Sequence, residues 1–390
     1  MAAGGHVSGD DPNRIGVVHL LGGSSPGGIE SFVLSLAREL DRARFALSVL
    51  ITDGDGPVAA ELRTLGIDVV LLGRQPSSLR HWWQYGRAVR ARRGAILHAN
   101  LGGRALRRVA KLAGCGPMIV HAHAPPDELV PTSRATLDER RAVVQNLTDG
   151  AARVLACSDA LAATLETPFP GQRPRVEVVR YGVDIAAYAG AGVARAAATL
   201  RAERKIPPSA PVVAFVGRLV PQKGIDHLAA VARTVLAERP RAHVLVAGDG
   251  PLRSHLAEIE KGPHAARCHL LGWRRDIPAI VTAADVLVVP SAWEPFGIVC
   301  IEAMAASRPV AAFAVDGLPE SVIDGVTGLL AKSGDTGALA QCVLQLIDAP
   351  ELRARLGRDG RARVEAHFQA RFTARRLEEI YAGLSARVTT

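Results

Sequence analysis

The chain has 390 residues, of which 48% are apolar and 22% are charged, and its formal net charge is +9. This length allows two domains of ordinary size, each with its own core, and the apolar share excludes a wholly disordered chain. The positive charge favours an anionic partner. The sequence has neither zinc-finger spacing nor the aromatic–basic interleaving typical of RNA-binding modules, so we expect no nucleic-acid partner.

The cysteines and the N-terminus indicate a cellular compartment. The five cysteines are scattered without Cys-x-x-Cys spacing, so we expect neither a zinc site nor a disulfide framework. No stretch reaches the roughly 20 apolar residues that a membrane span requires. Residues 1–13 are small and polar, without the apolar core of a signal peptide. We therefore expect a cytoplasmic protein with a disordered N-terminus over residues 1–13.

Short apolar runs alternate with helix-length segments along the first half of the chain. We expect strands at Ile15–Leu20, Ala46–Ile51, Asp68–Leu72, Ile96–Ala99, Met118–His121, Arg153–Ala156 and Val176–Val179. This alternation is typical of a parallel sheet covered by helices. It predicts an N-terminal α/β domain over residues 14–185.

A second series of strands follows an alanine-rich stretch that ends in several prolines. Because prolines break regular structure, we expect residues 186–210 to be a linker. Further strands are expected at Val212–Val216, His243–Ala247, Cys268–Leu271, Val286–Val289 and Val310–Phe313. The pattern predicts a second α/β domain over residues 211–370.

The segment Glu294-Pro295-Phe296-Gly297-Ile298 follows the strand Val286–Val289 and opens a helix that we expect over residues 297–306. Amides at a helix N-terminus and the helix dipole attract phosphate. Glu302 lies on the same face as Ile298, and its side chain leans toward the start of the helix. Two carboxylates with bare amides between them suit a ligand with phosphates and hydroxyls, such as a nucleotide sugar. The alternative is a solvated acid at a helix start.

Arg218 and Lys223 are five residues apart in a loop that follows the strand Val212–Val216 and runs from Gly217 to Gly224. Two cations in such a loop can clamp a pyrophosphate, arginine through bidentate contacts and lysine as a point charge. The alternative is a pair of ordinary surface cations.

Glycines and histidines mark the predicted first domain. Gly27 and Gly28 precede its first long helix, where glycine lets the backbone approach a ligand. This loop lacks the pattern Gly-x-Gly-x-x-Gly, which disfavours a dehydrogenase. His121 and His123 lie two residues apart at a strand end and share one face. No third metal ligand is evident beside them, so we expect no metal site; His98 ends the preceding strand.

Several further motifs complete the series: Gly248-Asp249-Gly250, Leu271-Gly272-Trp273, Gly317-Leu318-Pro319-Glu320 and Asp324-Gly325-Val326-Thr327-Gly328. In this order the series resembles glycosyltransferase family 4, retaining enzymes of the two-domain GT-B architecture, over residues 15–340. The resemblance implies two Rossmann-like domains that face across a cleft. It also implies that residues 371–390 form a helix that crosses back to the first domain.

The resemblance implies a role for each site residue. Arg218 and Lys223 would bind the donor phosphates and stabilise the leaving nucleoside diphosphate. Glu302 would hold the ribose hydroxyls and Glu294 the sugar hydroxyls, and His123 would be the histidine that faces the cleft. The catalytic set is therefore Arg218, Lys223, Glu294 and His123. Other donor-binding positions are expected at Gly27, Gly28, Gly217, Trp273, Arg274, Phe296, Gly297, Ile298 and Val299.

The chain departs from the family pattern at Tyr181, where the family often has Asn before Gly-Val-Asp, and Trp293 precedes Glu294. No carboxylate nucleophile is evident, and the family favours attack on the face from which the diphosphate leaves. The family generally needs no metal, so we expect neither a metal nor a cofactor.

We predict a retaining glycosyltransferase that moves a hexose-type sugar from a UDP- or GDP-linked donor to a hydroxyl acceptor, in the biosynthesis of a glycan, glycolipid or glycosylated metabolite. A sugar-nucleotide epimerase on a similar scaffold and a non-catalytic nucleotide-sugar binder are the alternatives. Residues 80–93 combine three aromatic residues with five arginines, which suits peripheral contact with an anionic membrane. The alternative is a surface helix whose Trp82 and Trp83 pack on the sheet.

Overall fold

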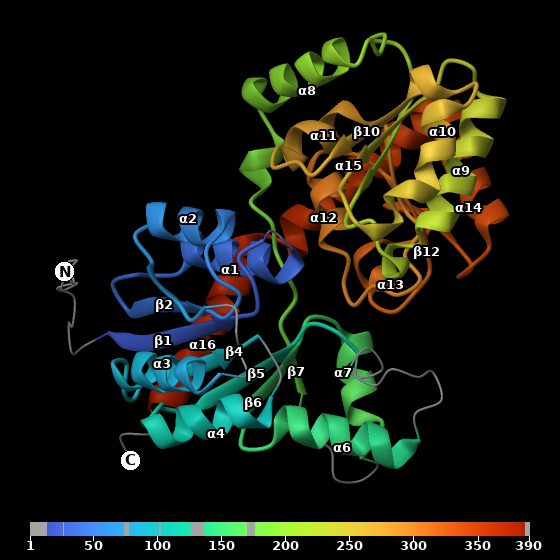
Figure 1. Ribbon diagram of the computed structural model, residues 1–390. Helices are drawn as coiled ribbons and strands as arrows, with labels where there is room; N and C mark the ends of the chain where they lie inside the picture. The colour runs from blue at the N-terminus through green and yellow to red at the C-terminus, as the bar shows by residue number, and fades with distance from the viewer. Residues whose placement is uncertain are drawn as a thin grey trace. The chain divides into compact units, whose positions relative to one another are not determined.

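The computed structural model describes residues 14–25, 27–73, 78–100, 103–125, 136–169 and 176–386. The described chain divides into two compact units (Figure 1). The first contains the chain up to Cys157, Ala162–Val179 and the residues from Thr373 onward. The second contains Ser158–Leu161 and Arg180–Phe372. The predicted disorder of residues 1–13 falls outside the described residues.

The first unit is built on a seven-stranded parallel sheet with the strand order β3-β2-β1-β4-β5-β6-β7. Its strands are β1 (Ile15–Leu21), β2 (Phe45–Ile51), β3 (Asp68–Leu71), β4 (Ile96–Ala99), β5 (Met118–Ala122), β6 (Arg153–Ala156) and β7 (Val176–Val178). Each of the seven strands expected from the sequence is present, with its ends shifted by at most one residue.

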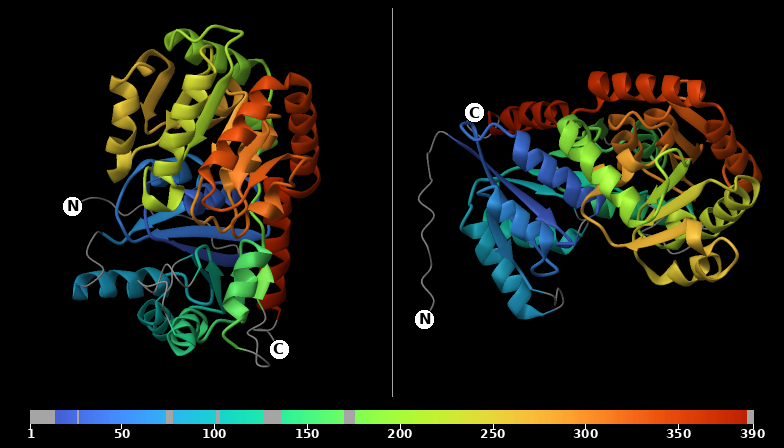
Figure 2. Two further views of the ribbon diagram at one scale, coloured as in Figure 1. Left: turned by 90° about the vertical axis from the view of Figure 1, so that its right-hand side faces the viewer. Right: turned by 90° about the horizontal axis from the view of Figure 1, so that it is seen from above.

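Helices cover both faces of this sheet (Figures 1 and 2). They are α1 (Gly28–Glu39), α2 (Pro57–Thr64), α3 (Leu79–Arg90), α4 (Arg104–Ala113), α6 (Leu137–Thr148), α7 (Asp159–Glu166) and α16 (Ala370–Ser385). Helices α1 and α2 pack together on one face, and α3 packs against α4 on the other. Alternation along β1 therefore places Val18 and Leu20 in the core beneath α3 and directs His19 toward α1.

The second unit contains a six-stranded parallel sheet in the order β10-β9-β8-β11-β12-β13. Its strands are β8 (Val212–Val216), β9 (His243–Ala247), β10 (Cys268–Gly272), β11 (Val286–Val289), β12 (Val310–Phe313) and β13 (Gly328–Ala331). The five predicted strands are confirmed. Strand β13 was not expected, because four residues that begin at a glycine beside a turn motif carry little strand signal.

Two layers of helices enclose the second sheet. They are α8 (Ala191–Glu203), α9 (Ile225–Glu238), α10 (Ala257–Lys261), α11 (Ile277–Ala283), α12 (Ile298–Ala305), α13 (Leu318–Ser321), α14 (Thr336–Asp348) and α15 (Pro350–His367). The 3₁₀ turns are η1 (Ile185–Tyr188), η2 (Pro221–Lys223), η3 (Pro251–Leu256) and η4 (Ala265–Arg267). Helix α14 packs on α9, whereas α8 packs on α11 and α15 on α12 (Figure 1).

The predicted linker differs from the structure. The chain passes into the second unit after Val179 rather than after residue 185, and residues 186–210 belong to that unit. They contain α8, which buries Ala197 and Leu200 against its neighbours. Alanine is the strongest helix former, so an alanine-rich stretch with buried positions folds as a helix rather than as a connector.

Each sheet reverses its strand order once, and the loops beside each reversal are candidate ligand-binding loops. In the first unit the order reverses between β1 and β4, and in the second between β8 and β11. Open parallel sheets bind ligands outside the carboxyl ends of the strands at such a reversal. The loops after β8 and β11 carry the charged motifs around Lys223 and Glu294.

The two tryptophans of α3, within residues 80–93, differ in their surroundings. Trp82 packs against the core beside Tyr85, whereas Trp83 is 63% exposed and lies beneath the Arg87 guanidinium. Thus one tryptophan packs on the unit and the other does not. No helix in the described part of the chain is long and apolar enough to cross a membrane.

Candidate functional site

The loop after β8 is held at the carboxyl edge of the sheet by backbone hydrogen bonds. The Gly217 amide donates to the Ala247 carbonyl at 3.0 Å, and the Leu219 amide donates to the Asp249 carbonyl at 2.9 Å. A Cβ at Gly248 would lie 1.8 Å from the Gly217 carbonyl oxygen. Gly248 therefore lets two loops close together, which is a packing role and not a ligand contact.

Lys223 and Glu294 meet at the strand-order reversal of the second unit. The Lys223 Nζ lies 2.5 Å from the Glu294 Oε2, and their side chains are 18% and 9% exposed. The Ser291 hydroxyl donates to the same carboxylate oxygen at 3.2 Å. The structure thus joins the two charged residues that the sequence placed 71 positions apart.

The backbone of Glu294 is held by Asp316, a residue that the sequence analysis missed. The Glu294 amide donates to the Asp316 Oδ2 at 2.8 Å, and the Gly317 amide donates to the Glu294 carbonyl at 3.1 Å. Asp316 itself has φ +42°. Aspartate tolerates this left-handed region, and its side chain bonds readily to nearby backbone. In the sequence, Asp316-Gly317 before Leu318 is the pattern that could have indicated this turn.

The start of α12 presents backbone amides without a side-chain cap. Gly297 is the N-cap residue with φ +82°, and the helix has no side-chain cap hydrogen bond and no acid in its first turn. The Phe296 side chain is buried and packs edge-on against Tyr181 and Phe368. Phe296 can therefore contribute to a ligand only through its backbone, as the adjoining Ile298 and Val299 amides can.

Glu302 lies on the second turn of α12 and accepts a hydrogen bond from the Tyr188 hydroxyl at 2.9 Å. Burial raises the pKa of the Glu302 carboxyl, and the hydrogen bond from Tyr188 lowers it in part. Tyr188 belongs to η1, within the stretch predicted as a linker, and for this reason the sequence analysis did not connect it with the site.

Three other predicted residues of this unit contact residues outside the Lys223–Glu294 pair. Arg218 is exposed, and its Nη2 donates to the Gln222 Oε1 at 3.2 Å. Arg274 forms a two-point ion pair with Asp276, at 2.7 and 2.6 Å. Trp273 is 47% exposed, and the Arg275 guanidinium lies 5.2 Å from its ring centroid.

In the first unit, His123 belongs to a buried polar cluster. Its Nε2 lies 3.0 Å from the Asn100 Oδ1, and its ring lies 4.2 Å from that of His121. Burial lowers the pKa of His123 to about 3, so the ring is neutral at neutral pH.

Gly27 is the N-cap residue of α1 and Gly28 its first residue. A Cβ at Gly27 would lie 2.6 Å from Glu30 Oε2.

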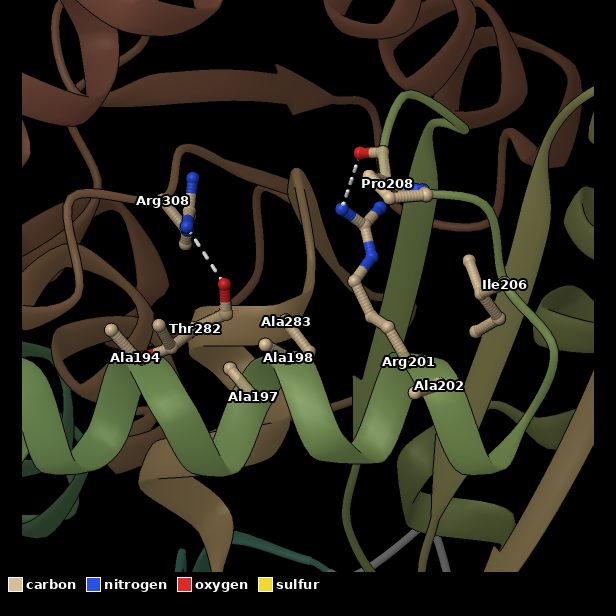
Figure 3. A pocket seen from close by; sticks show the side chains of 10 residues that line it. All are labelled: Ala194, Ala197, Ala198, Arg201, Ala202, Ile206, Pro208, Thr282, Ala283 and Arg308. Carbon is tan, nitrogen blue, oxygen red and sulfur yellow. Dashed lines mark hydrogen bonds between the residues drawn. The ribbon is translucent and has the colours of Figure 1, made fainter.

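A cavity of about 400 Å³ in the second unit lies away from these residues, between α8 and α11 (Figure 3). It is lined mainly by alanines, and its two arginines are engaged with the backbone. Arg201 donates to the Pro208 carbonyl at 3.0 Å, and Arg308 donates to the Thr282 carbonyl at 2.7 Å. These arginines hold α8 and α11 in place, so their presence in the cavity wall has a structural explanation and does not indicate a ligand.

Two family models match successive parts of the chain. Residues 26–187 match "Glycosyltransferase Family 4", and residues 197–363 match "Glycosyl transferases group 1". The D-inositol 3-phosphate glycosyltransferase of Corynebacterium efficiens is 36% identical over 266 residues, 65% of this chain and 61% of that protein. The alpha-maltose-1-phosphate synthase of Mycobacterium tuberculosis is 33% identical over 241 residues, 58% and 62% of the two chains. The chain thus spans about three fifths of these relatives.

Solved structures share the fold. HepE of Anabaena in complex with UDP-glucose has a TM-score of 0.80 and 23% identity, covering 95% of this chain and 100% of that chain. The sucrose-phosphate synthase of Thermosynechococcus elongatus has a TM-score of 0.77 and 24% identity, covering 96% and 100%. Together with the two parallel sheets, these likenesses show the expected architecture of two Rossmann-like units.

Proposed function

This chain belongs to glycosyltransferase family 4, and from that membership we propose that it transfers a hexose-type sugar from a nucleoside-diphosphate sugar to a hydroxyl acceptor. The observation that carries the proposal is the Lys223–Glu294 pair beside the uncapped start of α12. A cation, a carboxylate and bare helix amides at a strand-order reversal match a ligand that has both phosphates and sugar hydroxyls.

The proposed mechanism assigns one task to each charged residue. When the bond between the anomeric carbon and the phosphate oxygen breaks, negative charge develops on the leaving diphosphate. Lys223 and Arg218 stabilise that charge, which is electrostatic catalysis. The acceptor hydroxyl attacks from the same face, and its proton passes to the leaving phosphate oxygen. The product then retains the anomeric configuration of the donor.

The carboxylates orient the donor in this proposal. Glu302, held by Tyr188, binds the ribose hydroxyls, and Glu294 binds the sugar hydroxyls. In the free protein Glu294 is paired with Lys223, so donor binding exchanges part of this pair for a phosphate contact. The exposed Trp273 is the proposed neighbour of the base. No metal takes part, because protein cations carry the phosphate charge.

The test of this function separates transfer from epimerisation. UDP-glucose, which is bound in the HepE structure, and GDP-linked hexoses are incubated with the protein, with and without acceptors. The acceptors include inositol phosphates and sugar phosphates, after the names of the relatives. We expect release of nucleoside diphosphate and a new glycoside only when acceptor is present. A donor epimer formed without acceptor would support the epimerase, and binding without turnover the non-catalytic binder.

We further propose that the face formed by α3 and α4 binds anionic lipid. The two helices pack together and contain no acidic residue. Their exposed positions include Arg80, Arg87, Arg90, Arg104, Arg108 and Lys111. Leu79, Trp83 and Leu112 are also exposed, at 89%, 63% and 86%. Cations around exposed apolar side chains suit the interface of an anionic bilayer.

Vesicle sedimentation tests this surface. Wild-type protein should bind vesicles that contain phosphatidylglycerol at low salt and less at physiological salt, because salt screens exposed charges. Replacing Trp83 by Ala, or Arg87 and Arg90 by Glu, should reduce binding, whereas the same charge change at the exposed Arg355 and Arg358 of α15 should not. Binding that is equal in all variants, or absent in wild type, would contradict the lipid proposal.

A further inference from the structure

Six polar side chains of the first unit form one buried hydrogen-bonded network at the reversal between β1 and β4. They are His19, His98, Asn100, His121, His123 and Tyr381. They come from β1, β4, β5, the segments that follow β4 and β5, and α16. Buried polar groups must be satisfied, so each hydrogen bond constrains the next.

The orientation of Asn100 is set by an atom that can only accept. One terminal atom of its amide lies 3.3 Å from the Leu20 carbonyl oxygen. A carbonyl cannot donate, so this atom is the amide nitrogen, Nδ2. The same nitrogen lies 3.2 Å from the His19 Nδ1, and the amide oxygen lies 3.0 Å from the His123 Nε2. His123 must therefore carry its proton on Nε2.

The direction of the other hydrogen bonds follows from this orientation. The His19 Nδ1 accepts from Asn100, so its Nε2–H donates to the Tyr381 oxygen at 2.9 Å. The Tyr381 hydroxyl then donates to the His98 Nδ1 at 2.7 Å. The His98 Nε2–H in turn donates to the His121 Nδ1 at 3.2 Å. A neutral imidazole has one N–H, so each ring has a single consistent tautomer.

Burial favours the neutral form of these imidazole rings. His19, His98 and His121 are 0%, 0% and 2% exposed. Burial lowers the pKa of His19 to about 3 and that of His98 and His121 well below the ordinary value. Tyr381 is also fully buried, and burial raises its pKa, so its hydroxyl keeps the proton that it donates.

We propose that Asn100, oriented by the Leu20 carbonyl, is a positioning residue that holds His123 as the Nε2–H tautomer and sets the tautomers of His19, His98 and His121. The Nε2–H of His123 then donates to the Asn100 oxygen, and Nδ1 carries the lone pair of the ring. The importance of this tautomer for catalysis rests on the proposed function and on the expected place of His123 in its catalytic set. The tautomer itself depends only on the network.

The C-terminal helix α16 contributes one member of the network, Tyr381. Tyr381 lies on α16, between His19 of β1 and His98 of β4. Its hydroxyl links the half of the network around Asn100 to the half around His121. Removal of this hydroxyl should separate the halves and leave the contact between Asn100 and His123 in place.

Ring-nitrogen NMR of histidine-labelled protein tests the assignment directly, because long-range proton–nitrogen correlations distinguish the two neutral tautomers. Wild type should show Nε2–H rings for His19, His98, His121 and His123. In Asn100→Asp both side-chain oxygens accept, so His19, His98 and His121 should switch to Nδ1–H while His123 keeps Nε2–H. A wild-type His123 with its proton on Nδ1, or three rings that do not switch in Asn100→Asp, would overturn the proposal.

Two further variants separate positioning from folding. Asn100→Leu removes the oxygen to which His123 Nε2 donates and should give a mixture of its tautomers, with a fall in kcat of about three- to tenfold, the size of one net hydrogen bond. Tyr381→Phe is the matched control and should leave the His123 tautomer unchanged. Equal melting temperatures for the two variants assign the difference to the tautomer. A mixed tautomer with unchanged kcat would support the network and contradict the catalytic role of His123.

Discussion

Lys223 and Arg218 share one loop but differ in their surroundings, and their replacement should separate catalysis from stability. We expect Lys223→Ala and Arg218→Ala each to lower turnover by about two to three orders of magnitude, the loss typical of one charge-stabilising group. Lys223→Ala should also destabilise the protein by about 3 kcal/mol, because it leaves the buried Glu294 carboxylate unpaired. Arg218 is exposed, so its loss should change stability by less than about 0.5 kcal/mol.

Steady-state kinetics and urea unfolding measure the two effects. Lys332→Ala, which removes another exposed cation of the second unit, is the control and should change neither. The double variant Lys223→Gln, Glu294→Gln removes both charges and should regain stability without regaining turnover. Near-normal turnover in both single variants would remove the phosphate clamp from the mechanism.

We expect the Glu302 carboxylate to destabilise the folded protein at neutral pH and to contribute to nucleotide binding. Burial raises its pKa in the folded protein above the ordinary value of 4.5. A carboxyl with a raised pKa stabilises the fold when protonated, and this contribution is lost as the pH rises through the native pKa. Glu302→Gln, which can keep the Tyr188 contact, should therefore raise the melting temperature near neutral pH.

The same variant should bind UDP about tenfold more weakly, because hydrogen bonds to a charged group contribute roughly 1.5–3 kcal/mol. Thermal unfolding across pH and calorimetric titration with UDP measure the two effects. The gain in melting temperature should shrink as the pH falls through the raised native pKa and should vanish below 4.5, the ordinary value for this carboxyl. A variant that binds UDP normally would contradict the ribose role, and one less stable at neutral pH would contradict the burial argument.

At the scale of elements, the start of α12 depends on a glycine that has little room. Gly297 has φ +82°, and a Cβ there would lie 2.4 Å from the Leu318 Cδ2. Gly325 has φ +71°, but nothing lies within 4 Å of the Cβ that would be added. Both positions disfavour a side chain through the backbone, and only Gly297 adds a clash.

We therefore expect Gly297→Ala to destabilise the protein by about 2–4 kcal/mol and Gly325→Ala by about 1 kcal/mol, since left-handed strain costs roughly 1–3 kcal/mol and a forced contact adds to it. Urea unfolding gives both values. Turnover of Gly297→Ala should also fall, because its amides shift with the turn. Equal destabilisation at the two sites would show that the Leu318 contact relaxes freely.

At the scale of the whole molecule, the proposed chemistry predicts the stereochemistry and the metal requirement of the reaction. The product should keep the anomeric configuration of the donor, because the acceptor attacks the face from which the diphosphate leaves. Activity should survive treatment with EDTA, because Lys223 and Arg218 carry the phosphate charge. NMR of the anomeric proton and carbon, and an assay after chelation, measure these outcomes. An inverted product, or activity that returns only with added Mg²⁺, would contradict the mechanism.

The sequence by itself determined the strands, β13 excepted, and the composition of the loops that follow β8 and β11. Apolar runs such as Val286–Val289 can form only buried parallel strands when helix-length segments separate them, and their boundaries were predicted to within a residue. Glycine and charge patterns at strand ends also marked Arg218, Lys223, Glu294 and Glu302 as candidates, because glycines, cations and free helix amides are local features of phosphate-binding turns.

Tertiary structure alone decided which residues meet. The Lys223–Glu294 pair, the Asp316 contact to the Glu294 backbone and the Tyr188 hydrogen bond to Glu302 each join distant segments. Asn100 and Tyr381 are 281 positions apart in the chain, and one histidine, His19, links them in the network. Local periodicity carries no information on such contacts. They depend on the order of the strands in each sheet and on the return of the last helix to the first unit.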